Sequence, residues 1–153
     1  MAWTEQEFAA LQAKQALKKS TLARTSGKKK PKKTNTPTES QDQIALFEWA
    51  EYIPELKLMH HIPNGGSRTA SEGARFKREG VKAGVSDICL PLPRGEYHGL
   101  YIELKAVNGR KATTAQFDFL RDVKAVGYYG AVCYGFDEAR EAIEKYLKMG
   151  EFE

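Results

Sequence analysis

Two short apolar segments separated by a turn constrain the fold of this 153-residue chain more than any other feature. Residues 85–93 read VSDICLPLP and residues 99–105 read GLYIELK, and each is typical of a strand. The RGEY between them indicates a hairpin turn. We therefore expect the two segments to pair side by side in one sheet.

Charged residues lie within both segments. Because side chains alternate between the two faces of a strand, Glu103 and Lys105 share one face and leave the other to Leu100, Ile102 and Leu104. An isolated Glu-x-Lys pair is also common on a solvated strand surface. Asp87 allows a turn interpretation as well, because Asp is depleted in strands.

The combination of these residues is more informative than any one of them. Pairing of the two segments brings Asp87 and Glu103 together near one end of the sheet, where two carboxylates repel unless a cation lies between them. Mg²⁺ binds carboxylates, waters and phosphate oxygens. Lys105 would stand beside such a metal, where it could hold a water or neutralise charge on a phosphate. These residues predict a phosphodiester hydrolase.

The remaining periodicity predicts a small mixed sheet flanked by helices, an α/β layered domain. Thr38 is a candidate cap for the first helix of this domain, and Asp137 for the last. The expected helices cover residues 38–53, 69–80, 113–127 and 137–149. The expected strands cover residues 55–63, 85–93, 99–105 and 128–136.

Positive charge is concentrated before this domain. Residues 1–38 hold nine Lys or Arg and two Glu, a net charge of +7, whereas residues 39–153 hold fifteen Lys or Arg and eighteen Asp or Glu, a net charge of −3. We expect residues 1–38 to be a basic arm with a helix over 3–23 and a flexible linker over 24–38. The arm is equally interpreted as a solvated tail or as a phosphate-binding segment.

Composition excludes several classes of protein. No apolar run approaches the roughly 20 residues that span a bilayer, and the N-terminus has no secretory pattern. Cys89 and Cys133 both lie in apolar, strand-like runs, which favours buried free thiols in a reducing compartment over a disulfide or a zinc site. We therefore expect a cytoplasmic protein.

The segment GVSDICLPLP…GLYIELK, with TAQFDFL downstream, resembles the Asp…(Asp/Glu)-x-Lys signature of the PD-(D/E)xK nuclease superfamily. More narrowly, residues 39–148, with HHIPNGG and FKREGVKAG, are similar to the VRR-NUC domain in its compact stand-alone form, which is found in phages and bacteria. The resemblance thus implies a bacterial or phage-infected cell. The resemblance implies a restriction-endonuclease-like core over residues 39–153. Ser86 departs from the family, which commonly has Pro before the aspartate, but proline brings no chemistry there.

The resemblance also implies the role of each site residue. Asp87 and Glu103 would be metal ligands, joined by the backbone carbonyl of Leu104, and Lys105 would be the catalytic lysine. Gln116 matches the family glutamine that supports the site. The glutamate of the first helix falls on Glu39, as a further metal ligand, with Glu48 as a competitor.

Residues 60–68, HHIPNGGSR, allow two interpretations. Two adjacent histidines in a strand face opposite sides, so they are not a chelating pair; one would be core and the other near the site. The glycines predict either a simple turn or a loop that lies close to DNA phosphates. The candidate nucleic-acid contacts, which a solvated surface explains equally well, are Asn64, Gly65, Arg68, Lys77, Arg78 and Lys82.

The sequence thus predicts a Mg²⁺-dependent DNA endonuclease, with Mn²⁺ able to substitute and no organic cofactor or membrane involved. No sequence-reading motif is present, so a DNA shape such as a branch or four-way junction is the expected substrate. The resemblance implies a homodimer, as in junction resolvases. The alternatives are a catalytically silent DNA-binding or assembly module and a restriction-type nuclease.

Overall fold

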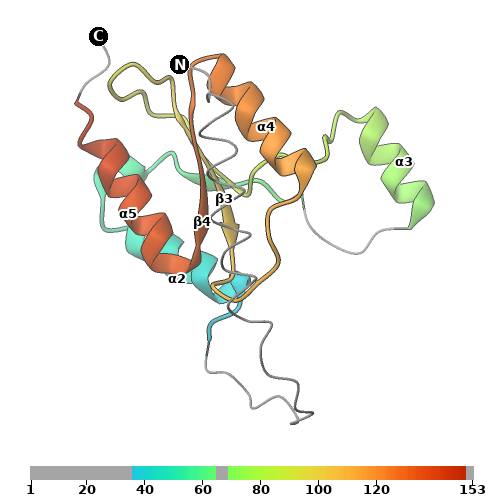
Figure 1. Ribbon diagram of the computed structural model, residues 1–153, viewed down its shortest axis with the longest axis horizontal. Helices are drawn as coiled ribbons and strands as arrows, with labels where there is room; N and C mark the ends of the chain where they lie inside the picture. The colour runs from blue at the N-terminus through green and yellow to red at the C-terminus, as the bar shows by residue number, and fades with distance from the viewer. Residues whose placement is uncertain (1–35, 65–68, 151–153) are drawn as a thin grey trace, which may run out of the picture.

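A four-stranded mixed sheet organises the chain, in the order β1-β2-β3-β4. The computed structural model describes residues 36–64 and 69–150. Both pairings of β2 are antiparallel, whereas β3 and β4 are parallel (Figure 1). The strands are β1 (His60–His61), β2 (Ile88–Leu90), β3 (Leu100–Lys105) and β4 (Tyr129–Tyr134). The expected hairpin is confirmed, with an additional bridge between Arg94 and Tyr97 in its turn.

Helices cover both faces of the sheet. On one face, α2 (Glu39–Ala50) and α5 (Gly135–Leu147) pack against each other and against β3, while α4 (Thr114–Ala125) packs against β4 on the other (Figure 1). The apolar face of β3 lies wholly in the core beside α2 and α5. The fully buried members of this core include Leu46, Ile88, Leu90, Leu100, Ile102, Leu104, Ile143 and Tyr146.

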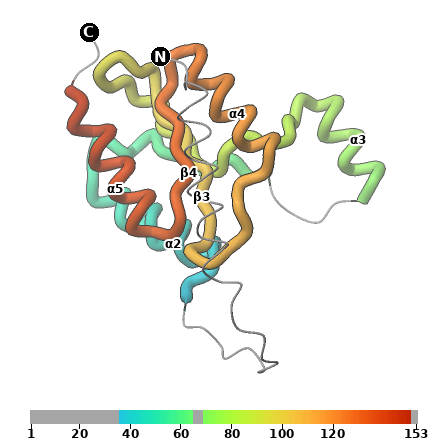
Figure 2. The backbone as a smooth tube through the Cα atoms, viewed as in Figure 1, coloured from blue at the N-terminus to red at the C-terminus, as the bar shows by residue number. Residues whose placement is uncertain are grey.

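The third helix, α3 (Ala70–Arg78), stands apart from this layered body (Figure 2). None of its residues is buried, whereas every other α-helix described has a buried side. A capping box closes its N-terminus, with Thr69 as the N-cap. Its C-terminal side turns at Gly80, whose φ of 95° is the left-handed conformation that glycine adopts without strain. The helix therefore forms from local signals.

Two expectations about local structure are wrong. Residues 55–63 form a strand only at His60–His61, because the chain first makes a 3-10 helix, η1 (Pro54–Leu56), with proline at its start. Asp137 is not a cap, because α5 already begins at Gly135. Instead Glu138 accepts a hydrogen bond from the Tyr134 backbone N–H at 2.8 Å.

Other expectations concern residues that the structure does not describe. The helix over residues 3–23 and almost all of the linker fall there, as do Gly65 and Arg68, so the proposed boundary of the arm at residue 38 stays a prediction. Within the described ranges, no helix is long and apolar enough to cross a membrane. Both cysteines are buried and free, as expected.

Candidate active site

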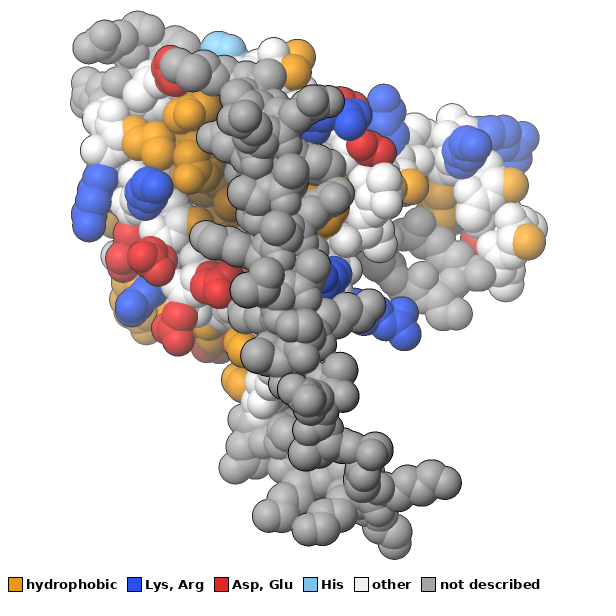
Figure 3. Space-filling model, in the orientation of Figure 1, with side chains coloured by type: hydrophobic (Ala, Val, Ile, Leu, Met, Phe, Trp, Pro, Cys, Tyr) orange, Lys and Arg blue, Asp and Glu red, His pale blue; other side chains and the backbone are white. Residues whose placement is uncertain are grey.

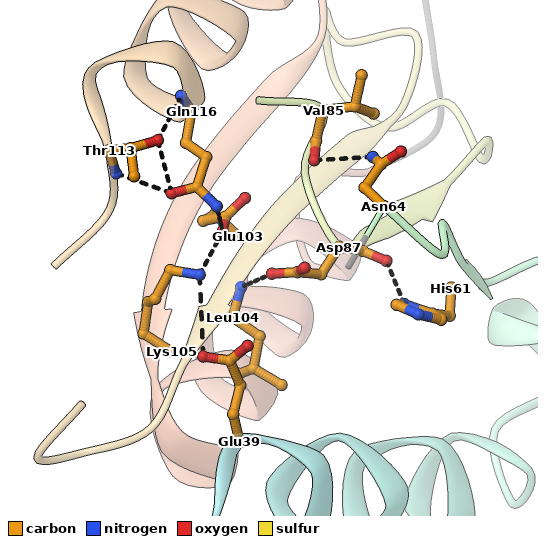
Figure 4. A network of polar contacts seen from close by, with 10 residues as sticks. All are labelled: Glu39, His61, Asn64, Val85, Asp87, Glu103, Leu104, Lys105, Thr113 and Gln116. Carbon is orange, nitrogen blue, oxygen red and sulfur yellow. Dashed lines mark hydrogen bonds and ion pairs between the residues drawn. The ribbon is translucent and has the colours of Figure 1, made fainter. Parts of the chain in front are cut away.

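The charged face of β3 is not a solvated surface. Glu103 is 0% exposed and Lys105 is 8% exposed. The Lys105 Nζ lies 2.6 Å from the Glu103 Oε1, so the two side chains form a buried ion pair (Figure 4). Burying a charged pair costs desolvation that surface pairs avoid, and such pairs are weak evidence of a stabilising role. A buried Glu-x-Lys pair on a strand therefore favours the functional interpretation.

The hairpin register places Asp87 next to this pair. Ile88 opposes Ile102 in the antiparallel β2–β3 ladder, so the preceding residue Asp87 lies across from Glu103. The Asp87 Oδ2 accepts a hydrogen bond from the Leu104 backbone N–H at 2.9 Å. The carboxylate thus takes the place of a ladder carbonyl where β2 begins, which explains why an aspartate is accommodated at the strand's entry.

Gln116 reaches the site from the first turn of α4. Its amide oxygen accepts from the Thr113 backbone N–H at 2.8 Å, as part of the capping box that begins this helix. Its amide nitrogen donates to Glu103 Oε1 (Figure 4). Because the cap fixes which end of the amide faces Thr113, the same cap turns the N–H₂ group toward Glu103.

Glu39 completes the cluster from α2. It is the first residue of that helix, and its Oε2 lies 3.8 Å from the Lys105 Nζ. Thr38, as expected, caps the helix and so fixes where Glu39 enters the site. Glu48, the competing candidate, is exposed near the other end of α2. The geometry therefore brings Glu39 and not Glu48 to Lys105.

Burial dominates the electrostatics of the cluster. Desolvation, opposed by Lys105 and reinforced by Asp87, raises the pKa of Glu103 to about 8. Desolvation acts in the opposite direction on Lys105, but its neighbours Glu103, Asp87 and Glu39 outweigh it and raise the lysine pKa above its ordinary value. Lys105 therefore remains a cation at neutral pH.

The donor set fits a hard divalent cation. The Glu103 Oε2 is buried and has no hydrogen-bond partner, which leaves an acceptor for a metal to satisfy. Within residues 36–64 and 69–150, no group of three or more His, Cys, Asp or Glu side chains could form a metal cage. A site with two carboxylates, waters and substrate oxygens is what Mg²⁺ accepts. The carbonyl of Leu104 as a further ligand stays a prediction.

The expected nucleic-acid contacts divide into two groups. Lys77, Arg78 and Lys82 are exposed, and Lys77 and Lys82 line an open hollow between α3 and residues 80–84. Figure 3 shows basic side chains on the part of the surface that α3 forms. Asn64 also lines this hollow, but its side chain donates to the Val85 carbonyl at 3.1 Å. Asn64 is thus tied to the protein backbone.

His61 makes a contact with the site that the sequence analysis did not predict. Its Nδ1 lies 2.8 Å from the Asp87 carbonyl oxygen, so it touches the backbone of a site residue. Among the described residues, the His60 ring bonds the nearby Leu58 carbonyl alone. Both histidines are exposed, so the expectation that one is core is wrong. The only sequence signal was their place in the HHIPNGG segment.

A mixed sheet covered by helices on both faces, with Asp, Glu and Lys gathered at its centre, defines the restriction-endonuclease-like class. No protein-family model and no curated protein matches the chain. Among solved structures, a VRR_NUC domain protein matches with a TM-score of 0.70 and 34% sequence identity, over 78% of this chain and 96% of that chain. The chain belongs to the VRR_NUC domain family, and its expected fold class is confirmed.

Proposed function

We propose that this protein is a DNA endonuclease that hydrolyses phosphodiester bonds with Mg²⁺, for which Mn²⁺ can substitute. The name of the similar structure, VRR_NUC domain protein, supports a nuclease. The observation that carries the proposal is the buried pair of Glu103 and Lys105 with Asp87 across the hairpin. A module that only binds DNA gains nothing from burying a carboxylate that lacks a partner for one oxygen.

Each side chain has a role that its position supports. Asp87 and Glu103 would hold the metal, which when bound supplies an activated water and Lewis acidity. Gln116 fixes the rotamer of Glu103 through its amide hydrogen bond. Lys105 stays charged and faces the same site, where it can orient a water or neutralise charge that builds on the phosphate. Glu39 holds the Lys105 ammonium from the opposite side.

Lys77 and Lys82 are the best-placed candidates for phosphate contacts. They are exposed, and the hollow that they line extends to Gly84, close in sequence to Asp87. Lysines bind the backbone of DNA without reading its sequence. The basic arm would add affinity of the same kind. These contacts favour selection of DNA by shape, such as a branch or a four-way junction.

A homodimer would allow two strands of a junction to be cut together. The helix α2 and the turn after it present apolar surface for such an interface, since Ile44 is 55% exposed and Tyr52 is 87% exposed. Trp49 is less available, because its ring packs edge-on against Phe136 at 6.4 Å. Sedimentation of the full chain tests this part of the proposal, and a monomer at assay concentrations would contradict it.

A panel of labelled DNA tests the activity and its substrate. We expect the full chain to cut a four-way junction faster than linear duplex, single-stranded or flap DNA, with Mg²⁺ or Mn²⁺ and not with EDTA. Lys105→Met keeps the length of the side chain but removes its charge, and should lower the rate by at least ~10²-fold. DNA binding without cutting in either metal would instead favour the silent binding module.

A further inference from the structure

Asp87 is held on two sides at once. Its carboxylate accepts from Leu104 on β3, while its carbonyl oxygen faces the other neighbouring strand. There the carbonyl accepts the Ile62 backbone N–H at 2.7 Å and meets the His61 Nδ1 at 2.8 Å (Figure 4). Since a carbonyl only accepts, the Nδ1 of His61 must carry the proton and donate.

The residue two positions before Asp87 is held from the same segment. The Asn64 side chain donates to the Val85 carbonyl at 3.1 Å. Asn64 itself is fixed by a turn in which its backbone N–H donates to the Ile62 carbonyl at 2.8 Å. Residues 61–64 therefore make three hydrogen bonds to the backbone of residues 85–87, and two of these come from side chains.

The opposite side of this backbone is blocked by α4. Gly84 has a φ of 83°, and a Cβ built there would lie 2.3 Å from the Ala115 carbonyl oxygen. Gly84 thus lies directly against the first turn of α4, which carries Gln116, while the carbonyls of Val85 and Asp87 are bonded to residues 61–64. A shift of this backbone would move the Asp87 carboxylate relative to Glu103.

We infer that His61 and Asn64 are positioning residues, whose side-chain hydrogen bonds fix the backbone of residues 85–87 and so set the Asp87 carboxylate at its distance from Glu103. The inference rests on the proposed function, because Asp87 needs this position as a metal ligand. It assigns Asn64 to the support of the site and not to DNA. Partners that orient metal ligands typically contribute 10- to 100-fold in metal affinity or activity.

Calorimetric titration of the full chain with Mn²⁺, in the absence of DNA, tests the role of His61. We expect His61→Ala to weaken Mn²⁺ binding about tenfold. His61→Asn should restore most of the affinity, because its amide nitrogen takes the position of Nδ1. His61→Gln places its nitrogen near the position of Nε2 and should not. His60→Ala is the matched control and should bind Mn²⁺ as the wild type does, since the His60 ring bonds the Leu58 carbonyl and no site residue in the described part of the chain.

Asn64→Asp tests the second contact at nearly constant shape. It replaces the donor that faces Val85 with a carboxylate oxygen, so we expect weaker Mn²⁺ binding and a lower kcat. The KM for DNA should stay near the wild-type value, whereas a phosphate contact at Asn64 would raise KM. Thermal unfolding of each variant identifies any that fail to fold. If His61→Ala fails to fold, the comparison of His61→Asn with His61→Gln still tests the role of His61.

Failure of the positioning role can be distinguished from failure of the proposed function. If Asp87→Asn abolishes Mn²⁺ binding while folded His61→Ala and Asn64→Asp bind and cut as the wild type does, the positioning role is overturned and the proposed function stands. The same conclusion follows if Asn64→Asp changes only KM. If the wild type binds no Mn²⁺, or Asp87→Asn binds it equally well, the proposed function fails and the positioning role fails with it.

Discussion

Glu103 is a buried carboxylate whose hydrogen bonds are incomplete among the described residues. It is fully buried, yet it accepts from Gln116 and pairs with Lys105 through one oxygen while its other oxygen has no partner. Desolvation favours the protonated acid even though Lys105 opposes it, which is why the pKa of Glu103 rises to about 8. A buried and incompletely paired carboxylate lowers the stability of the fold, which favours a role for Glu103 in chemistry over a role in stability.

This conflict predicts how stability depends on pH in EDTA. Between the ordinary pKa of 4.5 and the folded-state value of about 8, the unfolded chain releases the Glu103 proton while the folded chain keeps it. The contribution of the protonated group to stability is therefore complete below pH 4.5 and is lost as pH rises through about 8. The loss is on the order of a few kcal/mol.

Urea unfolding of the wild type and of Glu103→Gln, each from pH 5 to pH 9 in ~0.15 M salt, checks this prediction. The amide cannot ionise, so the difference between the two curves isolates the contribution of Glu103 from that of every other group that the two proteins share. We expect Glu103→Gln to gain stability relative to the wild type as pH rises. Parallel curves would show that Glu103 is ionised throughout.

At the scale of single elements, the beginning of α4 serves the helix and the site together. Thr113 and Gln116 form a capping box, and Gln116 then reaches Glu103 with its remaining amide group. The α3 helix begins with an equivalent box between Thr69 and Glu72, but it stands apart from the layered body and none of its residues is buried (Figure 2). Comparing variants of the two capping boxes therefore separates the loss of helix stability from the effect of a disturbed site on cleavage.

Thr113→Ala should therefore slow cleavage in addition to weakening α4. The lost cap costs about 1 kcal/mol, and the freed Gln116 amide should lower the single-turnover rate several-fold. Thr69→Ala removes the same kind of cap from α3 and should leave the rate at saturating DNA unchanged. Equal rates for both variants at saturating DNA would show that the cap does not orient Gln116.

Elements with local signals were predictable from the sequence, and those set by tertiary contacts were not. Thr38 and the turn at residues 94–97 mark boundaries through capping and turn chemistry, and these boundaries are confirmed. Residues 55–63 were predicted as a strand because their apolar residues fit one. Proline at the start of η1 and the short antiparallel edge at His60–His61 decide the outcome instead.

The same division holds within the site. The chemistry of Asp87, Glu103 and Lys105 could be inferred because strand alternation and a hairpin fix their relation. The hydrogen bonds from His61 and Asn64 join residues far apart in sequence, which no local pattern encodes. Glu39 could be separated from Glu48 only once the packing of α2 on β3 was known.

At the scale of the whole molecule, charge and chemistry are divided between different parts. The basic residues of the arm precede a domain whose own net charge is negative, and within that domain α3 carries exposed lysines and arginines away from the layered body. The buried site lies on the face of β3 that Gln116 and Glu39 border. The arrangement supports phosphate contacts on the outside and hydrolysis at the sheet.

One measurement tests this account most directly: single-turnover cleavage of a labelled four-way junction by the wild type, Glu103→Gln and Glu48→Gln, with Mg²⁺ and with EDTA. We predict cleavage by the wild type and by Glu48→Gln in Mg²⁺ only, and none above background by folded Glu103→Gln. Cleavage by Glu103→Gln at the wild-type rate, or cleavage that persists in EDTA, would contradict a metal site built on Glu103.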